Sequence, residues 1–215
     1  MTDLVAAFSV LPTSTVSDAM DKRGVAGQCE GLHPIDPASR TCGRVFTVLY
    51  LPCETVKGDV GDYVDDVPGG YVAALDNRGR TDCTVWGDLL SMTASQRRLA
   101  GTVIDGVCRD SAVSSEKGYP IFSRGVHMRT GKSRVYAAAY NVPVNLGGVV
   151  VRPDDILLGD RDGVVVIPAE MAEAVLESAR EIANAEERIR AEVDNGMRLG
   201  DARAKFAYHK LQDAR

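Results

Sequence analysis

The amino-acid sequence predicts an α/β fold that ends in a long helix. An apolar run at residues 102–104, after a predicted helix, indicates a strand buried on both faces, as in parallel sheets. Short apolar segments between residues 142 and 167 lie close together in sequence and favour antiparallel pairing or a closed sheet. Residues 169–195 carry apolar side chains in alternating steps of three and four, the spacing of an amphipathic helix.

Length and composition restrict the class of protein. A chain of 215 residues with 45% hydrophobic content can bury the core of one domain, and we expect one. The formal net charge of -5, with no run of basic residues, argues against a nucleic-acid partner. No apolar segment approaches the roughly 20 residues of a membrane-spanning helix, and the N-terminus lacks the basic start of a signal peptide. We therefore expect a cytoplasmic protein without a membrane partner.

The cysteines and histidines do not form a recognisable site. The 5 cysteines include no CxxC pair, which argues against a disulfide framework or a thiolate zinc site and favours reduced thiols. The 3 histidines lack the HxH or HExxH spacing of a metal site. Cys108 lies beside Arg109, but no histidine is near it in sequence, so we do not expect a catalytic thiol.

The N-terminal segment predicts one surface helix and one strand. Residues 14–23 place Val16 and Ala19 on one helical face, and a glycine follows as a stop signal. Residues 28–42 are rich in Gly, Pro, Asp and Ser and predict a loop, whereas residues 44–50 have the β-branched and aromatic content of a strand.

The next segment predicts a polar loop, a second strand and a turn. Residues 57–70 are rich in Gly and Asp, which indicates a solvated acidic loop with one helical turn around residues 61–64. Residues 71–75 are apolar and predict a strand, and residues 76–79 predict the turn that ends it.

The middle of the chain places charged residues at the ends of predicted elements. Asp88 precedes an apolar helical pattern and is the expected N-cap, while Gly101 is expected to end the helix in a left-handed conformation. The buried strand at residues 102–105 then leads to Arg109 and Asp110 in the following loop. Loops beyond the carboxyl ends of such strands are where sites usually lie.

The C-terminal part predicts short strands and then one long helix. The strands are expected at residues 121–123, 135–140, 142–145, 148–151, 156–158 and 164–167. Residues 160–163 resemble part of a calcium loop, but the other ligand positions are missing, so we expect a turn. Pro168 suits the first turn of the helix over residues 169–195, and Gly196 can end it.

One carboxylate interrupts the apolar stripe of this helix. Glu186 falls in the single gap of a stripe formed by Ala172, Val175, Ala179, Ile182, Ile189 and Val193. A polar residue on an otherwise apolar seam is a local inconsistency of the kind found at functional sites. Glu186 is therefore a candidate site residue.

The candidate residues form a set suited to a hard divalent metal: Asp88, Asp110, Glu186 and Arg109. Magnesium takes few protein carboxylates together with waters and substrate oxygens, and an arginine beside it can bind two oxygens at once. The N–H groups of Leu89 and Leu90 at the helix start can hold an anion. The alternative for each residue is an ordinary structural role: a helix cap for Asp88, a surface ion pair for Arg109 and Asp110, and a partner of a basic side chain for Glu186.

The same residues resemble those of a known family. The run Gly87-Asp88-Leu89-Leu90, the later segment AGTVIDGVCRD and the downstream VNLGGVVVRPDDILLGDRDGVVVIP are similar to the class II pyruvate aldolases typified by 4-hydroxy-4-methyl-2-oxoglutarate / 4-carboxy-4-hydroxy-2-oxoadipate aldolase. These belong to the RraA-like family, named after regulator of ribonuclease activity A. The resemblance extends from about Ser14 to the end of the long helix.

The resemblance implies a role for each residue that matches the motif. Asp110 would bind Mg²⁺ or Mn²⁺ directly, and Asp88 would hold the metal through water. Arg109 would contact pyruvate and stabilise its enolate, while the amides of Leu89 and Leu90 would bind the pyruvate carboxylate. A glutamate from the C-terminal helix of a neighbouring subunit completes the site in these aldolases, and Glu186 corresponds to it, also acting through water; Glu187 is the alternative.

The resemblance also implies a fold, an assembly and an activity. We expect an αββα sandwich with mixed sheets over residues 1–215, with a core at about 14–168 and a C-terminal helical extension at about 169–215. The assembly would be a homotrimer or a homohexamer with a shared active site. The implied enzyme is a metal-dependent lyase that releases pyruvate from a 4-hydroxy-2-oxo acid, with decarboxylation of oxaloacetate as a further activity.

A non-catalytic member of the same family is the alternative. Some ribonuclease-regulating members bind a protein and lack the first aspartate of the motif, whereas Asp88 is present here. A related metal-dependent reaction on an oxo acid in a biosynthetic pathway is a further alternative. The chain departs from the usual pattern with Pro153-Asp154-Asp155 in place of Pro-Gly-Asp, and its next acidic residue after Arg109-Asp110 comes late, at Glu116.

Overall fold

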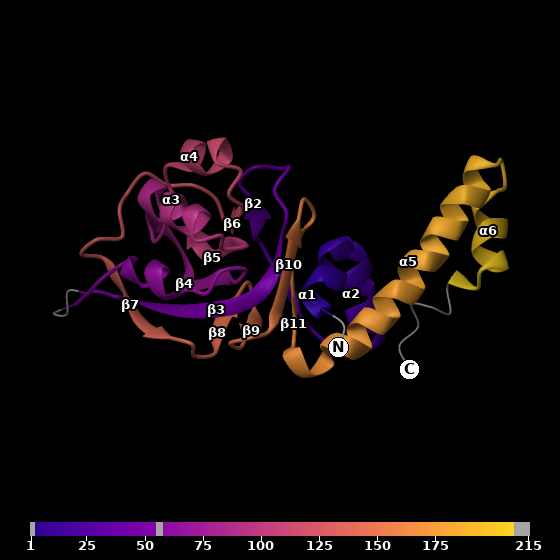
Figure 1. The fold of residues 1–215 in the computed structure, drawn as a ribbon, viewed down its shortest axis with the longest axis horizontal. Coiled ribbons are helices and arrows are strands. Elements are labelled where there is room, and N and C mark those ends of the chain that lie inside the picture. Colours follow the sequence, from indigo (N-terminus) through magenta and orange to yellow (C-terminus); the bar gives the residue numbers. More distant parts are fainter. Residues whose placement is uncertain (1–2, 55–57, 209–215) are drawn as a thin grey trace.

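The computed structural model describes residues 3–54 and 58–208, which form a mixed α/β structure (Figure 1). Its strands are β1 (Gln28–Cys29), β2 (His33–Pro34), β3 (Thr41–Pro52), β4 (Val72–Thr84), β5 (Gly101–Val107), β6 (Ile121–Ser123), β7 (Val135–Tyr140), β8 (Val144–Leu146), β9 (Val149–Val151), β10 (Ile156–Asp160) and β11 (Gly163–Ile167). Its helices are α1 (Leu4–Ser9), α2 (Thr13–Lys22), α3 (Asp88–Gln96), α4 (Ser111–Glu116), α5 (Ala172–Asp194) and α6 (Leu199–Lys205), with 3-10 turns η1 (Asp62–Asp66) and η2 (Ala169–Met171).

One long strand belongs to two different groups of strands. The first residues of β3 pair antiparallel with β10, from Thr41 to Arg44, and its next residues pair parallel with β4, from Val45 to Leu49. The parallel set continues through β5 to β6, and the antiparallel set continues from β10 through β11 to β1. The mixed sheet expected from the sequence is confirmed, because parallel and antiparallel strands meet on β3.

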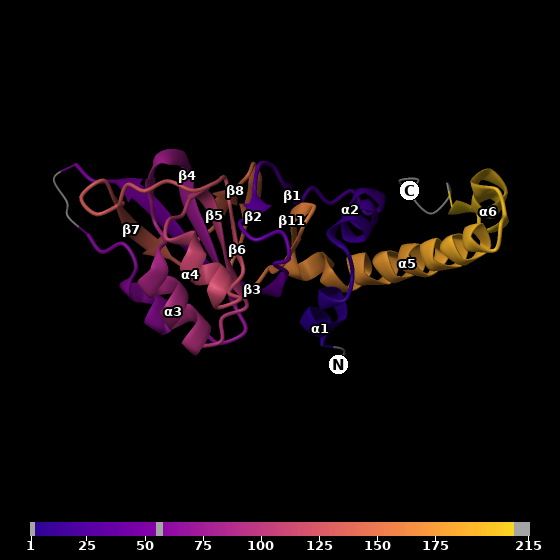
Figure 2. The same cartoon turned by 90° about the horizontal axis from the view of Figure 1, so that it is seen from above.

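Three apolar cores separate the layers of the molecule. One packs α3 and the loop after it against one face of the parallel strands, through residues such as Trp86, Ala94 and Ile104. A second joins the opposite face of these strands to β10, β11 and the β8–β9 hairpin. The third packs α1, α2 and α5 on the outer face of β10 and β11. The order helix, sheet, sheet, helix is the expected αββα sandwich, and Figure 2 shows the two helical layers on either side of the strands.

Several expected elements are present with shifted limits. The helix expected at residues 14–23 is α2, and the strand expected at residues 44–50 is the longer β3. All of β5 is buried, which confirms a strand covered on both faces. The expected helical turn near residues 61–64 is η1, although position 57 of that loop lies outside the described residues.

Three local predictions are wrong. Residues 28–42 contain the short strands β1 and β2, because their backbone groups pair with β11 and β6. The turn expected at residues 76–79 is a kink inside β4, where Arg78 and Gly79 have positive φ and the register against β5 shifts. Helix α3 ends at Gln96 with Arg98 in the left-handed region (φ 59°), whereas Gly101 starts β5, where a Cβ would lie 2.7 Å from the Thr41 Oγ1.

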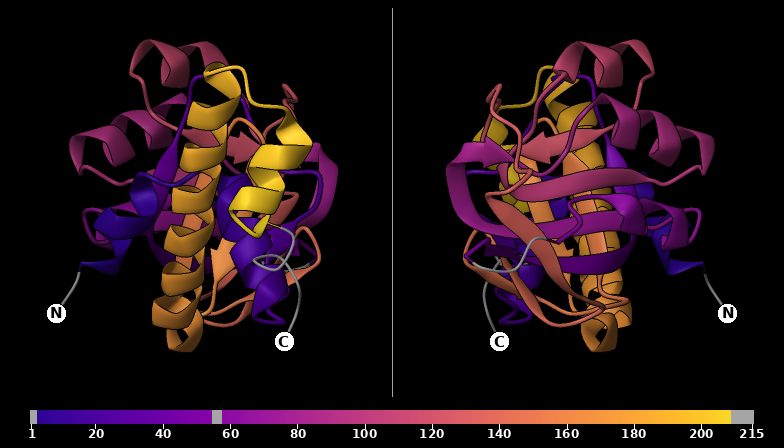
Figure 3. Two further views of the ribbon diagram at one scale, coloured as in Figure 1. Left: turned by 90° about the vertical axis from the view of Figure 1, so that its right-hand side faces the viewer. Right: turned by 90° about the vertical axis from the view of Figure 1, so that its left-hand side faces the viewer.

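The C-terminal helices extend away from the sheets. Helix α5 starts against α2 and continues beyond the body, and α6 turns back beside it (Figures 1 and 3). The predicted apolar stripe is buried except for Val193, which is 38% exposed near the far end. Gly196 follows the helix with φ 91°, as expected for its end. The predicted extension after residue 208 lies outside the described residues.

Across the part of the chain that the structure describes, no helix combines the length and the apolar character needed to cross a membrane.

The central strand β5 provides a test of the packing. Ile104 is fully buried in the core beneath α3, so Ile104→Ala should lower the free energy of unfolding by about 3 kcal/mol through lost burial and a cavity. Val150 on the β8–β9 hairpin is 56% exposed, and Val150→Ala should change the free energy of unfolding by less than about 0.5 kcal/mol. Urea denaturation followed by circular dichroism measures the free energy of unfolding of both variants. An equal loss of stability in the two variants would contradict this description of the core.

Candidate active site

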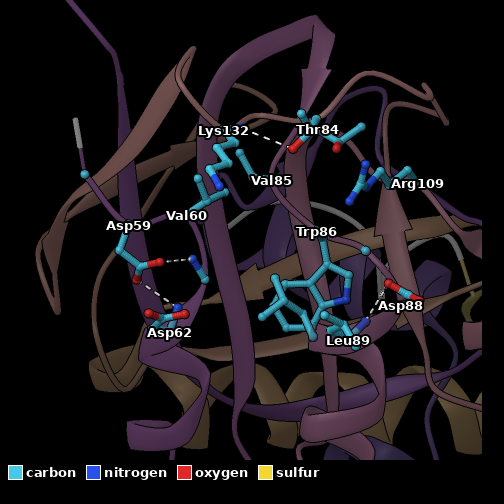
Figure 4. Close-up of a pocket in the computed structure, with 15 residues that line it drawn as sticks. Asp59, Val60, Asp62, Thr84, Val85, Trp86, Asp88, Leu89, Arg109 and Lys132 are labelled. Atoms are coloured by element: carbon cyan, nitrogen blue, oxygen red, sulfur yellow. Dashed lines mark hydrogen bonds between the residues drawn. The ribbon is translucent and has the colours of Figure 1, made fainter. Parts of the chain in front are cut away.

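One candidate site is a pocket beyond the carboxyl ends of the parallel strands β4 and β5. It has a volume of about 490 Å³, within the range of small-molecule sites. Its walls come from residues 58–62, from residues 84–87 at the end of β4, from residues 88–90 at the start of α3, and from Arg109, Thr130 and Lys132 (Figure 4). A site at this edge of the sheet was expected from the sequence.

The start of α3 differs by one residue from the prediction. Gly87 is the N-cap and Asp88 is the first helical residue, so the expected capping role of Asp88 is wrong. The Asp88 carboxylate instead accepts a hydrogen bond from the Leu89 N–H at 2.8 Å. The Leu89 N–H, which was expected to bind a substrate carboxylate, is thus bonded to Asp88 in the structure.

The loop after β5 is held against the loop before α3. The backbone N–H of Arg109 donates to the Trp86 carbonyl at 3.0 Å, and this hydrogen bond joins the loops that follow β5 and β4. Asp110 has a left-handed backbone (φ 54°), an uncommon conformation for a residue with a side chain and one that occurs at functional sites. The Arg109 Nε lies 3.3 Å from the Asp110 Oδ2, and both side chains are about 40% exposed.

Gly87 makes this close arrangement possible. A Cβ at this position would lie 3.0 Å from the Asp110 Oδ2 and 3.3 Å from the Arg109 Nε. Contacts at these distances are tighter than most Cβ atoms make, so an added Cβ would require the ends of both charged side chains to shift by a few tenths of an ångström. The glycine therefore brings the motif of α3 and the motif after β5 into contact.

The structure brings most of the predicted site residues together. Asp88, Leu89, Leu90 and Arg109 line the pocket, and Asp110 contacts Arg109 at its edge. These are the residues expected to bind the metal and the substrate.

Glu186 does not join them within one chain. It lies on α5, on the other side of the sheets from α3 (Figure 1). Its carboxylate accepts hydrogen bonds from the Tyr208 hydroxyl at 3.0 Å, from Arg190 at 3.1 Å and from the Thr15 hydroxyl at 3.4 Å. The break in the apolar stripe is thus occupied by a polar cluster, and Glu187 beside it is exposed.

The residues at the pocket fit a hard divalent cation only in part. Asp88 and Asp110 supply carboxylate oxygens of the type that magnesium prefers, and magnesium needs only one or two of them. Among the described residues of one chain, no group of three or more His, Cys, Asp or Glu side chains is arranged to hold a metal ion. A metal at this position would therefore need water, substrate or a second chain for its other ligands.

Several residues that line the pocket were not expected from the sequence. The acidic loop at residues 58–62, expected to be solvated, forms one wall. Both carboxylate oxygens of Asp59 accept backbone hydrogen bonds, from Gly61 at 2.9 Å and from Asp62 at 2.8 Å. Lys132 reaches the pocket from a loop far along the chain. No local pattern indicates such residues, because the contact depends on how distant loops pack.

Trp86 forms the floor of the pocket while remaining buried. Its ring stacks on Tyr119 with a centroid distance of 6.3 Å, and its Nε1–H donates to the Ser91 hydroxyl at 3.0 Å. Cys108, in the same core, is fully buried, and burial raises the pKa of its thiol to about 11. A neutral buried thiol is a poor nucleophile, which agrees with the expectation that Cys108 is not catalytic.

Comparison with known proteins agrees with the resemblance seen in the motifs. Residues 13–166 match the family model RraA-like, described as Aldolase/RraA. The chain is 34% identical over 203 residues to a Halalkalibacterium halodurans protein named "Putative 4-hydroxy-4-methyl-2-oxoglutarate aldolase", which covers 92% of each chain. It is 36% identical over 201 residues to protein DlpA of Legionella pneumophila, covering 92% of this chain but only 33% of that longer protein.

Solved structures give the same result for the fold. An uncharacterized protein from Pseudomonas syringae pv. tomato has a TM-score of 0.88 and 37% identity, with coverage of 93% of this chain and 96% of that one. Streptomyces coelicolor RraAS2, described as an unusual member of the RNase ES inhibitor RraA protein family, has a TM-score of 0.82 and 28% identity, covering 89% and 98%. The match over most of the chain and the likeness to these proteins show that this chain belongs to the RraA-like family.

Proposed function

We propose that this protein is a divalent-metal-dependent lyase that cleaves a carbon–carbon bond in a 4-hydroxy-2-oxo acid and releases pyruvate. The observation that carries the proposal is the contact between Arg109, Asp110 and the glycine before Asp88, which places a cation and two carboxylates at one helix start. Relatives that carry the name "Putative 4-hydroxy-4-methyl-2-oxoglutarate aldolase" support an aldolase-type function.

The residues at the helix start would bind the oxo-acid end of the substrate. The N–H groups of Leu89 and Leu90 lie at the positive end of the α3 dipole and suit the substrate carboxylate. Asp110 would hold the metal directly and Asp88 would hold it through water. When bound, such a metal supplies a Lewis acid that polarises the 2-oxo group.

Arg109 would stabilise the charge that develops as the bond breaks. The 4-hydroxyl loses its proton, the C3–C4 bond breaks to form a carbonyl at C4, and the electron pair moves through C3 to the 2-oxo oxygen. A guanidinium fixed beside that oxygen lowers the energy of this step. Protonation of C3 then gives pyruvate. Among the described residues, no histidine lines the pocket, so we expect a water molecule ordered by Asp88 to carry the proton.

The same charge develops when oxaloacetate loses carbon dioxide. The C3–C4 bond breaks in the same position, and the electron pair again moves to the 2-oxo oxygen. We therefore expect oxaloacetate decarboxylation at this site.

We further propose that the site is shared between subunits of a homotrimer or homohexamer. Glu186 lies far from the pocket of its own chain, but it is on an arm that extends from the body and can reach a neighbouring copy (Figure 2). Within its own chain it is bonded to Tyr208 and Arg190 near the same arm and to Thr15 of α2, and these contacts keep its position defined.

A second candidate function is a non-catalytic protein-binding role. It is favoured by the likeness to the Streptomyces coelicolor protein, which is described as a member of an RNase inhibitor family. The presence of Asp88 and Asp110 beside Arg109 favours the enzyme, because a binding scaffold does not need a carboxylate in a left-handed backbone conformation at a pocket edge. A related metal-dependent reaction on another oxo acid would use the same residues.

The lyase proposal can be tested by measuring pyruvate release with lactate dehydrogenase, using 4-hydroxy-4-methyl-2-oxoglutarate and oxaloacetate with and without Mg²⁺ or Mn²⁺. Asp110→Ala and Arg109→Ala should each lower kcat at least about 100-fold, because each removes charge stabilisation of the transition state. Glu116→Ala is the matched control, since Glu116 is exposed on α4 outside the pocket, and should keep full activity.

The outcomes separate the two classes of function. If the metal-loaded wild type releases pyruvate from neither substrate, the lyase proposal is wrong. A protein-binding role would then predict a biological effect that persists in the Asp110→Ala variant.

The shared site can be tested by mixing variants. Glu186→Gln should lower turnover while the fold measured by circular dichroism stays unchanged, because the carboxylate would be lost from a neighbour's site. Mixing it with Asp110→Ala should restore part of the activity, since some interfaces then combine an intact Asp110 with an intact Glu186. Absence of rescue, after mass spectrometry has verified subunit exchange, would count against a shared site.

A further inference from the structure

A glycine on the pocket wall at residues 58–62 leaves room for a leucine of the proposed substrate site. Gly61 of this wall and Leu90 in the first turn of α3 both line the pocket. A Cβ at Gly61 would lie 2.7 and 2.8 Å from the two δ-carbons of Leu90 and 3.2 Å from its Cγ. The φ of Gly61 is −155°, so glycine provides space here rather than a left-handed backbone.

The wall that carries Gly61 is bonded to the strands behind it. The Asp59 carboxylate accepts the backbone N–H of Gly61 at 2.9 Å, and the Asp59 carbonyl accepts the backbone N–H of Ala137 in β7 at 2.9 Å. The hydroxyl of Tyr50, a fully buried residue of β3, donates to the Val60 carbonyl at 2.6 Å. Because these bonds hold the wall, a larger residue at position 61 would displace a side chain in front of the wall.

The Leu90 side chain is the group that would have to move. It is partly buried and packs against the core beneath α3, where dense packing leaves little room for a shift. The pocket is the open side of Leu90. Figure 4 shows Asp59 of the wall and Asp88 of the helix start on opposite sides of Trp86. The free width between wall and helix start therefore depends on the contact between Gly61 and Leu90.

We propose that Gly61 is a positioning residue that determines how large a substituent the substrate can carry beyond its 2-oxo group. The inference rests on the proposed 2-oxo-acid site and adds a limit on substrate size to it. With the carboxylate at the start of α3 and the 2-oxo group at Arg109, the rest of the substrate extends between Leu90 and the wall at residues 58–62. Glycine at position 61 keeps this space wide enough for a branched carbon chain.

Gly61 acts through Leu90 and takes no part in bond cleavage. A methyl group at position 61 would push the Leu90 side chain into the space for the substituent, while the backbone N–H groups of α3 and the Arg109 guanidinium keep their places. Short 2-oxo acids would then bind as before, and branched ones would be overpacked. A general loss of structure would instead weaken the binding of both kinds of ligand.

Binding can be measured without turnover by the fluorescence of Trp86, the one tryptophan in the sequence, which lines the pocket. With Mg²⁺ present, pyruvate and the branched 4-methyl-2-oxopentanoate would be titrated into wild type, Gly61→Ala and the double variant Gly61→Ala/Leu90→Ala. The control is Gly200→Ala in α6, outside the pocket, where an added Cβ would meet no atom of the described residues within 4 Å.

Gly61→Ala should weaken the binding of 4-methyl-2-oxopentanoate about tenfold, the usual size of an overpacking effect, and change that of pyruvate less than about twofold. The double variant should restore the ratio of the two dissociation constants to within about threefold of wild type, because the δ-carbons that meet the new methyl group are gone. Gly200→Ala should behave as wild type.

Three results would overturn the role of Gly61. They are equal weakening of both ligands in Gly61→Ala, no weakening of either, and a double variant that discriminates as strongly as Gly61→Ala. If circular dichroism shows that Gly61→Ala does not fold, the double variant decides. It should fold and keep the wild-type ratio, and its failure to fold would show that position 61 does not act through Leu90.

Turnover separates this inference from the proposed function. In the pyruvate assay, Gly61→Ala should lower kcat/KM for 4-hydroxy-4-methyl-2-oxoglutarate about tenfold and that for the smaller oxaloacetate less than about twofold. Equal values of this loss for the two substrates, in an active protein, would refute the role of Gly61 and leave the lyase intact. If wild type neither binds nor cleaves any of these oxo acids, both proposals are wrong.

Discussion

The pairing of one strand, β3, with both β10 and β4 is the constraint on which the rest of the structure depends. Its first residues pair with β10 and its next residues with β4, so one continuous strand connects the antiparallel group to the parallel group. Gly43 lies at the junction, where a Cβ would come within 2.5 Å of the Gly70 carbonyl oxygen. The two groups can therefore pack face to face with a single apolar core between them.

This arrangement places the carboxyl ends of β4 and β5 at one edge and leaves α5 at the other side (Figure 1). The pocket forms at that edge, because the loops after the two strands are tied together by the hydrogen bond from Arg109 to the Trp86 carbonyl. The same architecture separates Glu186 from the pocket of its own chain. A site that uses both must therefore be built by two copies.

The charged side chains at the edge of the pocket lie close to the backbone at the start of α3. Asp110 has a left-handed conformation, and its carboxylate lies close to Gly87, where a Cβ would come within 3.0 Å of its Oδ2. The Arg109 guanidinium lies beside it, with its Nε 3.3 Å from the Asp110 Oδ2, and would provide positive charge for the anionic transition state of the proposed reaction. Lys132, on a separate turn, lines the far side of the same pocket.

The sequence by itself determined the elements whose signals are local. The apolar run of β5, the stripe of α5 with its glycine end, and the Asp88 and Arg109-Asp110 motifs were all recognisable, because periodicity and turn chemistry act over a few residues.

Only the tertiary structure decided what depends on distant contacts. It replaced the expected turn after residue 75 by a kink within β4, and it paired residues 28–29 and 33–34 as strands, because edge pairing overrides local composition. It also brought Asp59 and Lys132 to the same pocket and gave Glu186 its hydrogen-bond partners. Neighbours that are far apart in sequence leave no local pattern, so packing alone brings them together.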